Sequence, residues 1–200
     1  MNLALTGPAV DGTAYIDVVG WAQHSPRWFD DAVMVWANYG LALFAVLMII
    51  GWWRSRREGA TAAMTALAVP VAVVVTFAVN TGIKSLVQEN RPCQSLRVST
   101  LEACPAPGDW SFPSNHAAIA AATAVALFFV SRRLGIVAAV AAVAMAASRV
   151  WIGVHYPHDV VVGAVIGGLV AFGAMTLLRR WLGGLAQRLS ATRLRPLLVS

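Results

Sequence analysis

The sequence is poor in charged residues: Asp, Glu, Lys and Arg together make up 12% of its 200 positions. About a quarter of the residues in an average soluble domain carry a charge, so this chain does not have the composition of a soluble globule. Hydrophobic residues account for 58% of the sequence and gather in long runs. Such runs are typical of transmembrane helices and indicate an integral membrane protein.

Acidic residues and lysine are also scarce. Nine acidic residues stand against 15 basic ones, which gives a formal net charge of +6, and Lys84 is the single lysine. A basic chain could bind nucleic acid, but here the arginines lie in short clusters between the apolar runs. Arginines in that position are topology signals of a membrane protein, so nucleic acid is not the expected partner.

Cysteine is almost absent. Cys93 and Cys104 are the only two, and both fall in one polar segment. Two cysteines are too few for a zinc site, and neither other ligands nor a carboxylate cluster accompany them, so we expect no metal and no cofactor. Outside a bacterial cytoplasm, a disulfide between these residues is favoured over two free thiols.

Five apolar segments predict an all-α fold, a polytopic transmembrane bundle of about five spanning helices in a single domain that covers residues 1–200. The predicted spans cover about residues 32–53, 60–83, 114–130, 134–150 and 160–178. In the segment 1–31, the residues Ile16, Val18, Val19 and Trp21 predict a short helix on the membrane surface, with a partly ordered tail as the alternative. Residues 181–200 form a basic, amphipathic tail.

The arginines also predict the orientation of the chain. They follow the first, third and fifth spans, in the segments 54–57, 132–133 and 179–195. The positive-inside rule places these segments, including the tail, in the cytoplasm. The stretches 84–116 and 148–159 then fall on the outer face, and we expect a multi-pass protein of the bacterial inner membrane whose site faces outward.

Ionisable residues gather at the predicted outer ends of the spans in three stretches. These are Lys84-x6-Arg91-Pro92, Pro113-Ser114-Asn115-His116 and Ser148-Arg149-x5-His155-x3-Asp159. Ionisable groups at the edge of a membrane helix mark a functional site by default. Fixed cations, two histidines and a carboxylate are the groups that an attack on a phosphate ester requires.

The three stretches resemble the signature motifs of the type 2 phosphatidic acid phosphatase (PAP2) superfamily. They occur in the family's order, and Asn115 stands where the family usually has glycine. A polar residue there is similar to the small bacterial undecaprenyl-diphosphate phosphatases of the bacitracin-resistance type. The resemblance implies phosphate release through a transient phosphohistidine.

Each motif residue receives a predicted role. His155 is the predicted nucleophile, because a neutral imidazole can attack phosphorus when a carboxylate holds its other nitrogen. Asp159, four residues on, is the predicted partner of His155. His116 opens the third span and is the predicted general acid.

The remaining motif residues are predicted to bind phosphate: Lys84, Arg91, Ser114, Asn115 and Arg149. Lys84 and Arg91 are seven apart and would share one face of a helix. The backbone N–H groups at the start of the third span would also bind phosphate. Asn115 either caps that helix or contacts substrate, with the cap favoured.

Three polar residues match no motif position: His158, Glu89 and Asn80. We expect all three at the surface.

The sequence therefore predicts an integral-membrane phosphatase whose partners are membrane lipids and a lipid phosphate. The favoured substrate is a polyprenyl (undecaprenyl or decaprenyl) diphosphate, hydrolysed to the monophosphate for recycling of a cell-wall carrier lipid. Alternatives are a phosphatidate or phosphatidylglycerophosphate phosphatase, a lipid phosphotransferase, and a non-catalytic lipid-binding or flipping protein. The intact residues His116, His155 and Asp159 favour an enzyme. The oligomeric state stays open.

Overall fold

The computed structural model describes residues 7–192 and 195–199, and within these ranges the chain is helical, without strands. The helices are α1 (Gly7–Gln23), α2 (Arg27–Tyr39), α3 (Leu41–Ser55), α4 (Ala60–Val87), α5 (Pro92–Leu96), α6 (Asn115–Phe128), α7 (Arg132–Trp151), α8 (Pro157–Ser190) and the short 3₁₀ helix η1 (Arg195–Leu197). The all-α bundle predicted from the sequence is confirmed.

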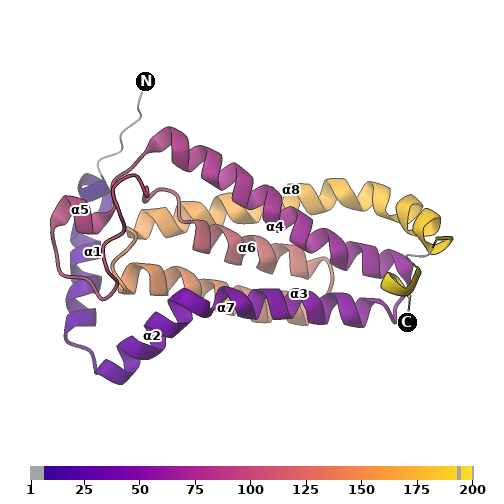
Figure 1. Ribbon diagram of the computed structural model, residues 1–200, viewed down its shortest axis with the longest axis horizontal. Coiled ribbons are helices and arrows are strands. Elements are labelled where there is room, and N and C mark those ends of the chain that lie inside the picture. Colours follow the sequence, from indigo (N-terminus) through magenta and orange to yellow (C-terminus); the bar gives the residue numbers. More distant parts are fainter. Residues whose placement is uncertain (1–6, 193–194, 200) are drawn as a thin grey trace.

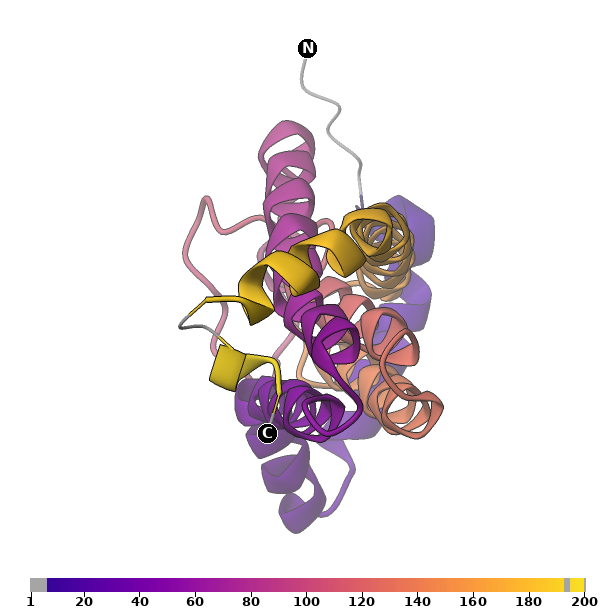
Figure 2. The same ribbon diagram turned by 90° about the vertical axis from the view of Figure 1, so that its right-hand side faces the viewer.

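The long helices lie side by side, and α1 crosses one end of the bundle next to α5 (Figure 1). Helix α6 is the packing centre, with its most extensive contacts to α8, α7 and α4. The view along the bundle shows the helices gathered around its axis (Figure 2). The α3–α4 turn and the C-terminal segment lie at the end opposite α1 (Figure 1).

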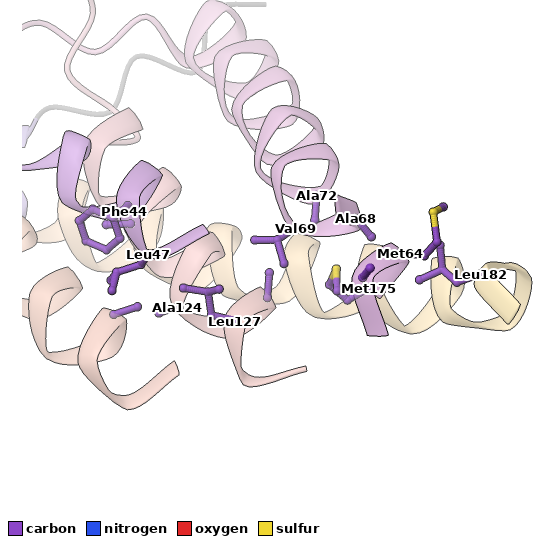
Figure 3. Packing of buried hydrophobic residues seen from close by; sticks show 14 of the residues in the cluster. Phe44, Leu47, Met64, Ala68, Val69, Ala72, Ala124, Leu127, Met175 and Leu182 are labelled. Atoms are coloured by element: carbon purple, nitrogen blue, oxygen red, sulfur yellow. The ribbon is translucent and has the colours of Figure 1, made fainter. Parts of the chain in front are cut away.

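Small residues allow the helices to approach closely, as membrane helices do when no hydrophobic effect drives them together. A Cβ atom on Gly163 would lie 2.6 Å from the carbonyl oxygen of Ser114, and one on Gly167 would lie 2.2 Å from that of Ala118. The two glycines therefore let α8 rest directly on the backbone of α6. Larger side chains fill the core further along, among them Phe44, Leu47, Val69, Leu127 and Met175 (Figure 3).

Among the residues that the structure describes, three helices are long and apolar enough to cross a membrane, α4, α7 and α8, and the pair α2 and α3 passes the same test when taken together. The predicted first span, residues 32–53, is not one helix, because α2 and α3 meet at Gly40 with a bend of 53°. The bend brings the junction against α7, where a Cβ on Gly40 would lie 2.7 Å from the terminal methyl of Met145. Helix α6 has 14 residues and is about 21 Å long, shorter than the ~30 Å hydrocarbon core.

The predicted boundaries also change at both termini. Helix α8 continues to Ser190, so the first half of the predicted tail prolongs the fifth helix. The C-terminal segment then folds back, with Leu198 buried and the Trp52 indole N–H donating to the Leu197 carbonyl at 3.0 Å. Helix α1 confirms the predicted N-terminal helix. Ile16 and Trp21 are exposed on this helix, whereas Val19 is buried and Tyr15 is fully buried. Its position on the membrane surface stays a prediction.

Candidate active site

The three motif stretches meet at one end of the bundle, where α4 ends, α6 begins and α7 leads into α8 (Figure 1). Five of the eight predicted site residues are buried: Arg91, Ser114, Arg149, His155 and Asp159. The other three, Lys84, Asn115 and His116, are partly buried. Residues up to 75 positions apart in the chain (Lys84 to Asp159) therefore line one site.

His155 lies in the short connection between α7 and α8, and its two ring nitrogens have different partners. Nδ1 lies 3.2 Å from Oδ2 of Asp159, and Nη1 of Arg91 lies 3.1 Å from Nε2. A guanidinium can only donate hydrogen bonds, so Nε2 is the acceptor and Nδ1 carries the proton that Asp159 receives. This tautomer leaves the lone pair of Nε2 as the nucleophile.

Burial also keeps His155 neutral. Its side chain is 2% exposed, and the loss of solvent lowers the pKa of His155 to about 3. The adjacent guanidinium of Arg91 acts in the same direction, while Asp159 opposes both. At neutral pH the imidazole is therefore in the form that can attack phosphorus.

Asp159 is the third residue of α8 and is fully buried. Its Oδ2 accepts hydrogen bonds from the Tyr156 backbone N–H at 2.8 Å and from the Ser111 hydroxyl at 2.5 Å. Pro157 occupies the first helical position, where its missing N–H has no consequence. The start of α8 thus holds the Asp159 carboxylate within hydrogen-bonding distance of His155.

Ser111 is a site residue that the motif analysis missed. Its hydroxyl oxygen also lies 3.4 Å from Nδ1 of His155, and its backbone N–H donates to the Glu89 carbonyl. It stands two residues before the second motif, outside the motif pattern, and its partners are 44 and 48 residues away. A polar residue so close to a motif was the one available signal.

The two cations of the first motif do not share a helix face, contrary to the prediction. Helix α4 ends at Val87 and Gln88 adopts a left-handed conformation, so Arg91 lies beyond the helix as the N-cap of α5. Lys84 donates to the carbonyls of Trp110 and Ser111 at 2.7 and 3.2 Å. The reversal of the chain after α4 brings Arg91 onto His155.

Arg91 is held from three directions. It donates to the carbonyl of Asp109 at 3.0 Å, to the carboxylate of Asp109 at 2.9 Å and to the carbonyl of Val154 at 2.9 Å. Two residues further on, Cys93 forms a disulfide with Cys104. The disulfide ties α5 to the same loop that carries Asp109 and Ser111.

Arg149 enters the site from the last turn of α7. Its Nη1 donates to the Ala37 carbonyl of α2 at 3.2 Å, and its buried Nε has no acceptor among the residues that the structure describes. Together with Arg91 and Lys84 it lies close enough to act on the charge of His116.

The start of α6 differs from the prediction in its cap. Ser114 is the N-cap residue, and its hydroxyl accepts from the Ala117 N–H at 3.5 Å, so Asn115 does not cap the helix. Instead, Oδ1 of Asn115 accepts from the side-chain amide of Asn80 at 2.6 Å. Asn80 is fully buried rather than exposed, because the end of α4 packs against this turn.

His116 follows in the first turn of α6, where backbone N–H groups have no partner within the helix. Its side chain makes no hydrogen bond to any residue within 7–192 or 195–199. An unengaged imidazole beside three cations is free to exchange a proton with a bound group. His116 lies at the start of α6, as the sequence predicts.

The expected surface positions of Glu89 and His158 are wrong. Glu89 is 2% exposed, and His158 is partly buried between Glu89, Asp11 and Asp159. The expectation that no ligand cluster exists is also wrong, because candidate ligand atoms of Glu89, His158 and Asp159 lie within 4.8 Å of one another. His158 and Asp159 are adjacent, but Glu89 lies 69 residues before His158, which hides the cluster from motif analysis.

A sequence profile described as the PAP2 superfamily matches residues 65–182. Undecaprenyl-diphosphatase BcrC of Bacillus subtilis (strain 168) is 32% identical over 157 residues, which cover 74% of this chain and 77% of that protein. Decaprenylphosphoryl-5-phosphoribose phosphatase of Mycobacterium tuberculosis is 35% identical over 132 residues, which cover 66% of this chain and 67% of that protein.

Two solved structures share the fold. LpxE of Aquifex aeolicus has a TM-score of 0.66 at 20% identity, covering 84% of this chain and 95% of that one. A transmembrane PAP2-type phosphatidylglycerolphosphate phosphatase of Bacillus subtilis has a TM-score of 0.61 at 20% identity, with coverages of 91% and 89%. At this level of identity the likeness concerns the arrangement of helices alone.

Proposed function

This chain belongs to the PAP2 superfamily and is a multi-pass membrane phosphatase, and on that basis we propose that it removes the terminal phosphate of a polyprenyl diphosphate through a phosphohistidine on His155. One observation carries the mechanism. The buried imidazole of His155 has its Nδ1 on Asp159 and its Nε2 on Arg91. That geometry supplies a neutral nucleophile with a carboxylate behind it and a cation in front of it.

In the first step, Nε2 of His155 attacks the terminal phosphorus of the lipid diphosphate. The bond from phosphorus to the bridging oxygen breaks, and the lipid monophosphate leaves. His155 becomes a phosphorylated imidazolium, and Asp159 stabilises the positive charge through Nδ1–H. Before attack, the N–H group of Arg91 that now contacts Nε2 turns to a phosphoryl oxygen.

His116 transfers the protons in both steps. It protonates the bridging oxygen as this oxygen leaves, and then takes a proton from the water that attacks the phosphohistidine. Inorganic phosphate departs, and His155 returns to its neutral form. The sum is lipid diphosphate plus water giving lipid monophosphate plus phosphate.

The cations bind the equatorial oxygens of the transferred phosphoryl group, where negative charge accumulates in the transition state. Arg149 is the clearest case, because a buried guanidinium whose Nε lacks an acceptor among the described residues has donors to spare. Ser114 and the first N–H groups of α6 complete the binding site in this proposal. Lys84 contributes positive charge and Asn115 contributes to the shape of the site, both from partly buried positions.

The membrane setting and the relatives support a polyprenyl substrate. One relative is named an undecaprenyl-diphosphatase, and the coverage includes most of both chains. The site lies at one end of a helical bundle, the place where a lipid headgroup meets water. In a bacterial inner membrane with this site on the outer face, the reaction would recycle a cell-wall carrier lipid.

A second candidate is a phosphate monoester on a polyprenyl-linked sugar. It is favoured by the 35% identity to a protein named decaprenylphosphoryl-5-phosphoribose phosphatase. The same nucleophile and cations would serve, but the leaving group would be a sugar alkoxide, which needs its proton from His116 more strongly.

Phosphate release by the detergent-purified protein distinguishes these functions. The panel contains undecaprenyl diphosphate, a decaprenylphosphoryl-5-phosphoribose, phosphatidylglycerophosphate and phosphatidate, each at matched detergent mole fraction. We expect the diphosphate to give the highest kcat/KM and His155→Ala to be inactive on every substrate. A higher kcat/KM for the sugar phosphate would favour the second candidate. No release from any of the four by a folded, inserted protein would contradict both.

A further inference from the structure

A second histidine, His158, stands on the far side of the carboxylate that supports His155. Its Nδ1 lies 2.8 Å from Oδ1 of Asp11. Its Nε2 lies 3.2 Å from Oε1 of Glu89 and 3.4 Å from Oδ1 of Asp159. Both ring nitrogens therefore face carboxylate oxygens, and only the imidazolium can donate on both sides.

Asp159 lies between the two histidines. Its Oδ2 faces His155, Ser111 and the Tyr156 N–H. Its Oδ1 is buried, accepts no hydrogen bond from any described residue, and has the cationic edge of His158 as its neighbour. Hydrogen bonds thus hold Oδ2 next to His155, whereas Oδ1 faces the positive charge of His158.

Helix α1 holds His158 in place through a single residue. The carboxylate of Asp11 accepts from both the backbone N–H of His158, at 2.7 Å, and the ring nitrogen Nδ1. The helical conformation of α1 is interrupted at Asp11, whose φ is −148° and ψ is 27°. Four residues later, the buried Tyr15 donates to the carbonyl of Gly153 at 2.9 Å. Helix α1 therefore contacts the chain on both sides of His155, at Gly153 before it and at His158 after it.

We propose that His158 is a positioning residue that, clamped by Asp11 of α1, keeps Asp159 ionised and directed at His155, so that α1 is a functional part of the active site. The proposal rests on the role of Asp159 in the proposed phosphatase reaction. Asp159 must remain a carboxylate to stabilise the phosphohistidine, although it is surrounded by protein and has no solvent to support its charge. His158 supplies that support from the side opposite the nucleophile.

The charge around His158 comes from every element packed against it. Asp11 on α1, Glu89 after α4 and Asp159 on α8 face its nitrogens, while the rings of Tyr156 and Phe112 contact its faces. Burial raises the pKa of Glu89, while the hydrogen bond to His158 and the charge of His158 act in the opposite direction. Glu89, Asp11 and Asp159 are therefore the carboxylates that favour the positive charge of His158.

The test compares pH profiles of two variants, His158→Gln and Asp11→Asn. We expect His158→Gln to lower kcat about 10- to 100-fold, by analogy with the outer partners that orient metal ligands, with KM changed less than about twofold. The acidic limb of kcat/KM should move to higher pH by about one to three units, because a neighbouring cation that favoured ionised Asp159 and neutral His155 has gone. Asp11→Asn should produce a smaller shift in the same direction.

The chain offers matched controls and a coupling test. Asp17 is exposed on α1, and His24 is exposed directly after the end of this helix, so Asp17→Asn and His24→Gln should leave kcat and the profile unchanged. The double variant Asp11→Asn/His158→Gln should be no worse than His158→Gln within about twofold, because both changes remove one interaction. A fall in kcat with an unmoved acidic limb would show a merely structural role and overturn the proposal.

A second readout does not depend on activity. The readout is the ¹⁵N spectrum of histidine-labelled protein in micelles, in which variants of each histidine assign the signals. At pH 7.5, His158 should have both ring nitrogens protonated. Asp11→Asn should lower the protonated fraction of His158. A neutral His158 would overturn the proposal, as would a His158 signal altered by EDTA, which would indicate a cation between Glu89, His158 and Asp159. If the wild type hydrolyses none of the lipids, the proposed function fails while this spectrum still decides the state of His158.

Discussion

The two histidines of the proposed reaction differ in their contacts, and this difference predicts different variant behaviour. His155 is held on both ring nitrogens, whereas His116 makes no side-chain hydrogen bond to the described residues. His155→Ala should abolish turnover of every substrate, because no phosphohistidine can form. His116→Ala should lower kcat ~10²–10⁴-fold for a lipid monophosphate, whose alkoxide leaving group needs a proton, and much less for a diphosphate or an aryl phosphate.

Steady-state phosphate release on the three substrate types measures this difference. Membrane insertion and thermal unfolding must first match the wild type. An equal loss on good and poor leaving groups would show that His116 binds phosphate rather than donating a proton.

The buried His155 also predicts how stability depends on pH. Its pKa of about 3 in the folded protein lies below the ordinary 6.5, so the unfolded chain binds a proton at a pH where the folded site does not. The stabilising contribution is therefore complete above about pH 6.5 and declines as pH falls from there towards 3. Between pH 6.5 and 5 the loss amounts to ~2 kcal/mol, at 1.36 kcal/mol per unit.

Thermal unfolding of the wild type and of His155→Gln at pH 7.5 and pH 5 tests this expectation. The wild type should lose more stability than the variant over this interval, because Gln does not titrate. Parallel losses would mean that other groups cause the decline.

At the scale of helices, the contact between α8 and α6 positions the carboxylate. The Ser114 N–H at the start of α6 donates to the Asp159 carbonyl at 3.0 Å, and Gly163 and Gly167 let the two helices touch below it. Gly167→Ala should destabilise the protein by about 1–3 kcal/mol, since its Cβ would lie 2.2 Å from a backbone oxygen that cannot move alone. Forced separation of the helices should also lower kcat.

Gly173→Ala is the matched control on the same helix, because a Cβ there has nothing within 4 Å. It should be neutral or slightly stabilising, as alanine favours helix over glycine by up to ~1 kcal/mol. Thermal unfolding and phosphate release of the two variants, measured side by side, check the prediction. Equal behaviour would show that α6 and α8 can separate without cost.

The apolar runs were sufficient to predict the helices but not the breaks between them. Hydropathy continues through Gly40, and the bend there follows from the approach of the α2–α3 junction to Met145, more than a hundred residues later. The reversal after Val87 likewise depends on Gln88 and on contacts with the loop before α6. The local sequence pattern predicts that a segment is helical, whereas contacts with residues far along the chain determine where the helix ends.

For the molecule as a whole, the motifs predicted which residues gather but not what holds them. His155 and Asp159 are four positions apart and their pairing follows from sequence spacing. Ser111, Asp11 and Asn80 act through partners between 33 and 147 residues away, which one sequence cannot reveal. The site is therefore built from one conspicuous set of residues and a second set that only the folded chain brings to it.

The placement of charge over the whole bundle predicts which end faces the cytoplasm. The motif end carries α1 and the disulfide, and the opposite end carries the α3–α4 turn with its arginines. The positive-inside rule places the arginine end in the cytoplasm and the proposed active site outside. Glu58→Cys in the α3–α4 turn and Ala106→Cys in the loop between α5 and α6 probe the two ends, since both positions are exposed.

A membrane-impermeant thiol reagent applied to intact cells should label Ala106→Cys and leave Glu58→Cys unlabelled until the cells are lysed. The wild type provides the background, because Cys93 and Cys104 are joined to each other in the structure. Each variant must retain phosphate release, so that labelling reports on the native orientation. The opposite pattern would place the site in the cytoplasm and remove the recycling of an outward-facing carrier lipid from the proposed function, while leaving the chemistry of His155 unaffected.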